Sequence, residues 1–186
     1  MVPLSDLWLP ILLSAVLVFA ASNVLHMVLT YHKSDYGAVP KEDEVMAALR
    51  AFSIPPGDYM IPKPGSMQEM KSPAFQEKWK RGPVATLTVM RSDHNFMGVT
   101  LVQWFVYCLV VSLFAAYITS RAVPSGAPYL EVSRFASTTA FAAYGLALWQ
   151  HSIWYRRSWS TTLKANVDAL IYGFVTGGAL GWLWPR

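Results

Sequence analysis

The sequence contains a single cysteine, Cys108, and few charged side chains. One cysteine excludes an intrachain disulfide and any zinc site built from several cysteines. Charged residues make up only 14% of the chain, whereas hydrophobic residues make up 54%. Soluble globular domains carry more charge than this. The shortage of charge therefore indicates a protein that is surrounded by lipid.

Local motifs of catalysis are also missing from the sequence. There is no glycine-rich phosphate loop, no glycine-flanked serine nucleophile and no Glu-x-x-His pair of metal ligands. No basic stretch with interleaved aromatic residues indicates nucleic-acid binding. These absences make a non-catalytic role the first expectation and leave the question of enzymatic activity open.

Hydrophobic residues gather in four runs that carry almost no charge. Each run has at least 21 residues, and about 20 helical residues cross the hydrocarbon core of a bilayer. A backbone in lipid must satisfy its own hydrogen bonds, so we expect these runs to be helical. The predicted fold is a membrane all-α bundle of four transmembrane helices, with a small cytoplasmic α/β insertion between helices 1 and 2. The predicted helices cover residues 7–31, 96–120, 135–155 and 165–185, and the insertion covers residues 32–95.

The first run is expected to be a retained helix. The preceding "MVPLSD" has no basic residue, and the apolar stretch is longer than the core of a typical signal peptide. The small residues of "VFAAS" keep a cleaved signal peptide open as an alternative.

Basic residues are distributed unequally between the connections. Twelve of the 15 Lys and Arg residues lie in the insertion or between the third and fourth runs, and the other three lie on the opposite side. Basic loops stay in the cytoplasm. We therefore expect both termini outside and the insertion inside.

The insertion is too long to be a simple connection. "PKEDEVMAALRAF" predicts a short amphipathic helix with acidic residues in its first turn. "DYMI" and "PVATLTVMR" predict two short strands. Between them, "SPAFQEKWKRG" predicts a helix with Ser72 as its N-cap and Pro73 in its first turn. Two short strands are marginal alone, so we expect this segment to pack on the helix ends or on a partner.

Three ionisable residues fall at one depth in the predicted bundle. His26, His151 and Asp168 each lie within about 7 Å of the cytoplasmic end of their helix, at a rise of about 1.5 Å per residue. Ionisable groups at membrane depth tend to face the bundle interior and pair with one another. His32 and His94 flank the insertion, and we expect both to be exposed.

Three interpretations of this cluster stay open. In the first, Asp168 neutralises a nearby basic residue, and the histidines bond to backbone or water without any cofactor. In the second, His26, His151 and Asp168 bind iron or another transition metal, or the two histidines bind haem. In the third, His151 and Asp168 exchange protons or serve a quinone near the aqueous face.

The fourth run contains a stripe of small residues, because Gly173, Gly177 and Gly181 are spaced four apart. Such a stripe lets another helix approach closely. The approaching helix belongs either to the same bundle or to another subunit.

The segments "PPGDYMIP", "KSPAFQEKWKRGPV", "SIWYRRSWSTTLK" and "DALIYG" resemble those of an uncharacterised family of small bacterial polytopic membrane proteins. The resemblance covers most of the chain and implies a bacterial inner membrane, but it implies no activity. We therefore expect a non-catalytic accessory, assembly or structural subunit of a larger membrane complex. Its partners would be the lipid bilayer and other membrane subunits or further copies of the chain, without nucleic acid.

The sequence also allows two functions other than the accessory role. The protein could be a metal- or haem-dependent redox protein, or a quinone- or proton-linked one, that uses the His–His–Asp cluster. A small transporter or channel is the third possibility, which the absence of an internal repeat disfavours.

Overall fold

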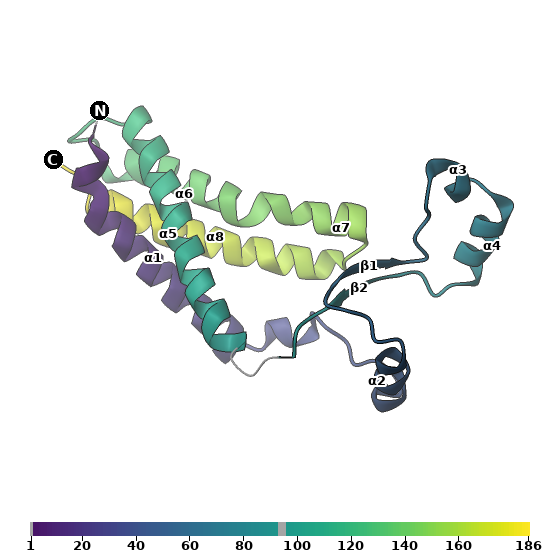
Figure 1. The fold of residues 1–186 in the computed structure, drawn as a ribbon. Coiled ribbons are helices and arrows are strands. Elements are labelled where there is room, and N and C mark those ends of the chain that lie inside the picture. Colours follow the sequence, from purple (N-terminus) through teal and green to yellow (C-terminus); the bar gives the residue numbers. More distant parts are fainter. Residues whose placement is uncertain (1, 93–95) are drawn as a thin grey trace. The chain divides into compact units, whose positions relative to one another are not determined.

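The computed structural model describes residues 2–92 and 96–186. The described residues divide into two compact units. One unit contains the chain up to Tyr36 together with the chain from Phe96 onward, and the other contains Gly37 to Ser92. All residues of the candidate site belong to the first unit, which the long helices build (Figure 1).

The apolar runs form helices, as the sequence predicts. The second and fourth runs each form one long helix, whereas short turns of another helix type interrupt the first and third. The bounds are a 3₁₀ turn at Leu4–Leu7, α1 at Trp8–Asn23, a π-helical turn at Val24–Val28, a 3₁₀ turn at Tyr31–Ser34, α5 at Phe96–Ala122, α6 at Tyr129–Gly145, a 3₁₀ turn at Leu146–Leu148, α7 at Trp149–Tyr155 and α8 at Trp159–Trp182.

The helices of the first unit pack through small side chains. α6 makes its most extensive contact with α8, and α1 contacts both α5 and α8. α1 and α5 run in opposite directions (Figure 1). The Trp104 indole near the start of α5 donates a 2.8 Å hydrogen bond to Ser22 Oγ near the end of α1. Small residues let helices approach closely. The buried small residues include Ser14, Ala15, Cys108, Ser112, Ala115, Ala116, Ala136, Ala140 and Thr176.

Large apolar side chains point outward from the same helices. A few large apolar side chains, among them Leu7, Leu180 and Tyr172, lie in the core, but many others are exposed. The exposed set includes Leu12, Val16, Val102, Val106, Phe114, Leu163, Val167, Leu170 and Phe174.

The structure supports two of the four predicted membrane spans. Of the helices in the described residues, only the segments Leu4–Val28 and Met97–Ala122 are long and apolar enough to cross a membrane. The third predicted span is divided by the 3₁₀ turn at Leu146–Leu148. The fourth, α8, is long enough but includes polar residues such as Asn166 and Asp168. The structure therefore shows two of the four predicted spans. The sequence prediction counted charges, and neither a break in a helix nor uncharged polar residues entered that count.

The second unit is a two-stranded sheet with short helices, which confirms the predicted α/β character. The strands pair antiparallel, with Gly57 opposite Val89 and Ile61 opposite Ala85. The elements are α2 at Glu42–Ala51, β1 at Gly57–Ile61, α3 at Met67–Met70, α4 at Pro73–Arg81 and β2 at Ala85–Val89.

Caps define the helices between the two strands. Ser72 Oγ accepts a 3.2 Å hydrogen bond from the Phe75 N–H, so the predicted N-cap of α4 is confirmed. The short helix α3 was not predicted. Ser66 Oγ accepts from the Glu69 N–H, and the Glu69 carboxylate accepts from the Gly65 N–H one position before the cap. A serine followed three residues later by glutamate is the pattern that could have predicted α3.

Candidate functional site

The end of α1 leaves the α-helical path just before the polar cluster. Val24–Val28 form the π-helical turn, and Tyr31–Ser34 form the 3₁₀ turn. A continuous α-helix would place residues 26 and 32 about 9 Å apart along its axis and on different faces. Instead, the rings of His26 and His32 stack with their centroids 4.3 Å apart. Single π-helical turns occur often at functional sites.

Asp168 on α8 is the centre of the cluster. Its side chain is 4% exposed, and its Oδ2 lies 2.8 Å from His32 Nε2 and 3.6 Å from His26 Nε2. The Tyr31 hydroxyl donates a hydrogen bond to the other carboxylate oxygen, Oδ1. Three residues from the end of α1 and the turn after it therefore face one carboxylate.

Lys164, one helical turn before Asp168, holds the same turn of chain in place. Its Nζ donates to the Tyr31 carbonyl at 2.6 Å and to Asp35 Oδ1 at 2.9 Å. Asp35 Oδ2 in turn lies 2.6 Å from His32 Nδ1. Residues four apart share one face of a helix, so α8 presents an ammonium group and a carboxylate to the same turn.

The surroundings shift the pKa values of two groups in this turn. Burial raises the pKa of the Tyr31 hydroxyl, and its hydrogen bond to the Asp168 carboxylate raises it further. Burial also acts to raise the pKa of Asp35, but the hydrogen bonds from His32 and Lys164 lower it by more, so the net shift is downward. Both groups therefore keep their ordinary charges at neutral pH: Tyr31 neutral and Asp35 ionised.

The cluster supports two chemical states. The ligand atoms of His26, His32 and Asp168 all lie within 4.8 Å of one another, so the three residues could hold a metal ion. Alternatively, His32 could donate to the carboxylates of Asp35 and Asp168 at once, which requires protons on both ring nitrogens.

The structure brings two of the three predicted site residues together. His26 and Asp168 meet, but His151 is not part of this cluster. His151 is exposed on α7, where its ring lies 5.9 Å from the Tyr155 ring and its carbonyl accepts from the Arg157 N–H. The metal site itself stays a prediction.

His32 occupies the place that the sequence assigned to His151. The expectation that His32 is exposed was wrong, because its side chain is only 13% exposed. The sequence extended the first helix to Tyr31, which would leave His32 beyond the helix end. The pairs His32/Asp35 and Lys164/Asp168, three and four apart, were the signal that could have indicated a polar contact. His94 lies outside the described residues.

The three glycines of α8 face α6. A Cβ atom at Gly173 would lie 2.9 Å from the Ser137 carbonyl oxygen, one at Gly177 would lie 1.9 Å from Ser137 Oγ, and one at Gly181 would lie 2.8 Å from the Tyr129 ring. The stripe therefore lies in the contact between two helices of the same unit.

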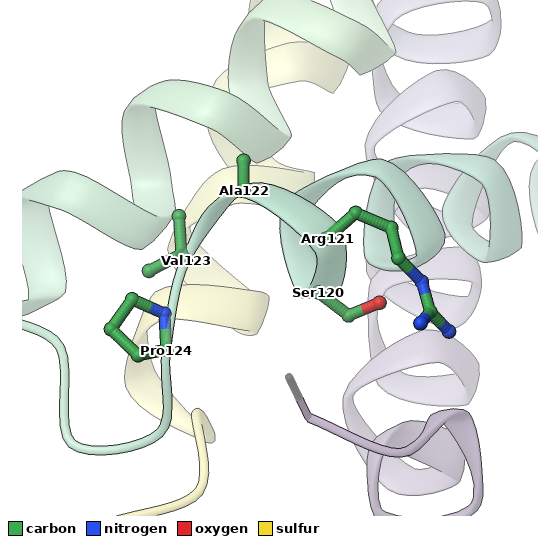
Figure 2. Close-up of a pocket in the computed structure, with 5 residues that line it drawn as sticks. All are labelled: Ser120, Arg121, Ala122, Val123 and Pro124. Carbon is green, nitrogen blue, oxygen red and sulfur yellow. The ribbon is translucent and has the colours of Figure 1, made fainter.

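A separate pocket of about 190 Å³ lies at the C-terminal end of α5 (Figure 2). The end of α8 lies near it, since the Trp184 indole donates to the Pro124 carbonyl. None of its described lining residues is a histidine or an acidic residue. Its lining residues are Ser120, Arg121, Ala122, Val123 and Pro124.

Comparison of the chain with models of protein families, with curated proteins and with solved structures finds no match.

Proposed function

We propose that the protein is an integral membrane protein in which α1, α5, the α6–α7 segment and α8 all cross the bilayer. The buried face of α8 carries Asp168, Tyr172 and Thr176, and its outward face is apolar. Polar groups turned toward the bundle and apolar groups turned outward suit a helix in lipid. The mean hydropathy of such a helix is low because it averages the polar inner face with the apolar outer face.

Hydrogen bonds at both ends of α8 support its crossing. Near the start of α8, Lys164 donates to the Tyr31 carbonyl, beyond the end of α1. After the end of α8, Trp184 donates to the Pro124 carbonyl, beyond the end of α5. α8 therefore covers the same length as the two helices that are apolar enough to cross a membrane.

The proposed location is a bacterial inner membrane with both termini outside. The excess of basic residues in 32–95 and between α7 and α8 favours a cytoplasmic position for these parts. The assignment to a bacterial membrane is based on the resemblance of four segments of the chain to those of small bacterial membrane proteins.

We further propose that the protein is a non-catalytic accessory, assembly or structural subunit of a larger membrane complex. The observation that carries this proposal is the apolar face of α2, which no described element of its own unit covers. All ten residues of α2 are exposed, and a helix of this length is marginal in water without packing. The apolar residues on or just after α2 are Val45, Met46, Leu49 and Phe52.

The proposed occupant of this face is another protein subunit. Three acidic residues, Glu42, Asp43 and Glu44, fill the first turn of α2. The cytoplasmic surface of a membrane is negatively charged, so it repels such a turn. An apolar groove on a partner subunit would bury the apolar face of α2, and basic residues at the edge of that groove would pair with the acidic turn.

The test is the mass of the protein extracted from its own membrane in a gentle detergent. The detergent-corrected mass should exceed the 20.8 kDa of one chain, and mass spectrometry should find other polypeptides in constant ratio. Met46→Lys together with Phe52→Lys should return the chain to its single mass. The control pair Glu77→Gln and Arg81→Gln, which removes an exposed ion pair on α4, should leave the complex intact. A single-chain mass for the unchanged protein, or an oligomer of this chain alone, would contradict the accessory role.

A further inference from the structure

Two imidazole rings and one carboxylate meet at the end of α1. His32 Nε2 and His26 Nε2 lie 2.8 Å and 3.6 Å from the same oxygen of Asp168. Nitrogen donors combined with one carboxylate suit zinc, ferrous iron and other divalent transition metals. Magnesium and calcium prefer ligand sets made of oxygen alone.

The distance between two ligand atoms of one transition-metal ion falls between the 2.8 Å and 3.6 Å found in this cluster. Bonds of about 2.0–2.1 Å at a tetrahedral centre place neighbouring ligand atoms about 3.3 Å apart. The 3.6 Å between His26 and Asp168 is too long for a hydrogen bond, so His26 is held next to the carboxylate without bonding to it. All three ligand atoms lie within 4.8 Å of one another, so a metal ion between them would bond to all three once the side chains draw together around it.

The groups behind the three ligands are those that a metal site uses. His32 Nδ1 lies 2.6 Å from Asp35, and the Tyr31 hydroxyl donates to the second oxygen of Asp168. Metal-bound histidines almost always bond through their other nitrogen to a carboxylate or carbonyl, which fixes the ring and its tautomer. Lys164 holds Asp35 from the other side at 2.9 Å.

We propose that His26, His32 and Asp168 bind one divalent transition-metal ion, with Asp35 orienting His32. Three protein ligands leave at least one coordination position for water or a small ligand. The side chain of His26 is 50% exposed, so the ion has a path to the site. This site does not depend on the accessory role, and its test is separate from the mass of the complex.

Zinc binding to the full chain tests the site. The protein is purified in detergent through a tag without histidine, stripped with a chelator and titrated with Zn²⁺ against a chromogenic competitor. One equivalent should bind, and His26→Gln, His32→Gln and Asp168→Asn should each weaken binding at least 100-fold. Asp35→Asn should weaken it 10- to 100-fold, the range for groups that orient a ligand. His151→Gln, which changes the exposed histidine of α7, should bind as the unchanged chain does.

Cobalt provides a second readout. Co²⁺ in the same site should give visible absorption bands of a four- or five-coordinate complex, and His26→Gln should remove them. His26 makes no hydrogen bond to Asp168, so His26→Gln should lower the melting temperature of the metal-free protein less than His32→Gln, which loses two side-chain hydrogen bonds as well as the same ring stacking. Absence of stoichiometric Zn²⁺ binding, or binding that is unchanged in both His26→Gln and His32→Gln, would overturn the proposal. That result would assign the cluster to a closed charge network around a protonated His32.

Discussion

Lys164 is the residue that fixes the turn after α1. Its ammonium group donates to the Tyr31 carbonyl, to Ser34 Oγ at 2.8 Å and to Asp35. The side chain of Asp35 is only 10% exposed. Without Lys164, the Asp35 carboxylate would keep His32 as its remaining partner in a poorly solvated position. An uncompensated buried charge is costly, so this single side chain should contribute strongly to stability.

We therefore expect Lys164→Met to lower the free energy of unfolding by about 2–3 kcal/mol, somewhat below the cost of breaking a fully buried pair. The measurement is unfolding of the metal-free protein in mixed micelles by a denaturing detergent. Lys33→Met is the control, because Lys33 is an exposed lysine of the same turn and should change stability by no more than about 0.5 kcal/mol. Equal effects of the two substitutions would show that the contacts of Lys164 do not hold the turn.

At the scale of elements, the contact between α6 and α8 depends on the absence of side chains on α8. Gly177 leaves no room for a Cβ, because that atom would also lie 2.7 Å from the Ser133 carbonyl oxygen on α6. Gly178, its neighbour, is different: a Cβ there would meet only the Tyr129 hydroxyl at 3.7 Å, an ordinary contact. Two adjacent glycines of one helix therefore have opposite expected responses to alanine.

Gly177→Ala should destabilise the protein by about 1–3 kcal/mol, because α6 must move away from α8. Gly178→Ala should be neutral or should stabilise it by up to about 1 kcal/mol, since alanine is the better helix former. Melting temperatures of the two variants in the same detergent measure the difference. If Gly177→Ala melts at or above the temperature of Gly178→Ala, the close approach of the two helices is wrong.

The sequence predicted elements where local chemistry decides them. Ser72 and Pro73 define the start of α4 in any context, so that helix was predicted correctly. The π-helical turn at Val24–Val28 was not predicted, because four of its five residues are as apolar as those of α1. Only packing and the hydrogen bonds of the following turn distinguish a helix that continues from one that changes its path. For the same reason, the sequence placed the end of the first helix at Tyr31 and predicted an exposed His32.

At the scale of the whole molecule, the proposed crossing of four segments fixes which connections share a side of the membrane. The chain has one native cysteine, which is buried, so Cys108→Ala provides a background without thiols. Single cysteines can then be placed at the exposed positions Glu77 on α4, Ser125 after α5 and Ser158 before α8.

We expect a membrane-impermeant maleimide to label Ser125→Cys in intact bacteria. Glu77→Cys and Ser158→Cys should react only after the membrane is permeabilised, because the basic connections stay in the cytoplasm. Labelling of both Ser125→Cys and Ser158→Cys in intact cells would show that the α6–α7 segment does not cross the bilayer. Labelling of Glu77→Cys would reverse the proposed orientation.

The sequence by itself determined the helical runs, the position of most elements and the spacing of the glycines on α8. These depend on local preferences and on periodicity, which a single chain segment carries. Only the tertiary structure decided which histidine joins Asp168 and which face of α8 turns inward. His26 and His151 lie at similar depths by residue counting, but depth says nothing about rotation around a helix axis or about a turn that folds back. The cluster at the end of α1 exists because one π-helical turn and one lysine bring residues more than 130 positions apart in the sequence into hydrogen-bond contact.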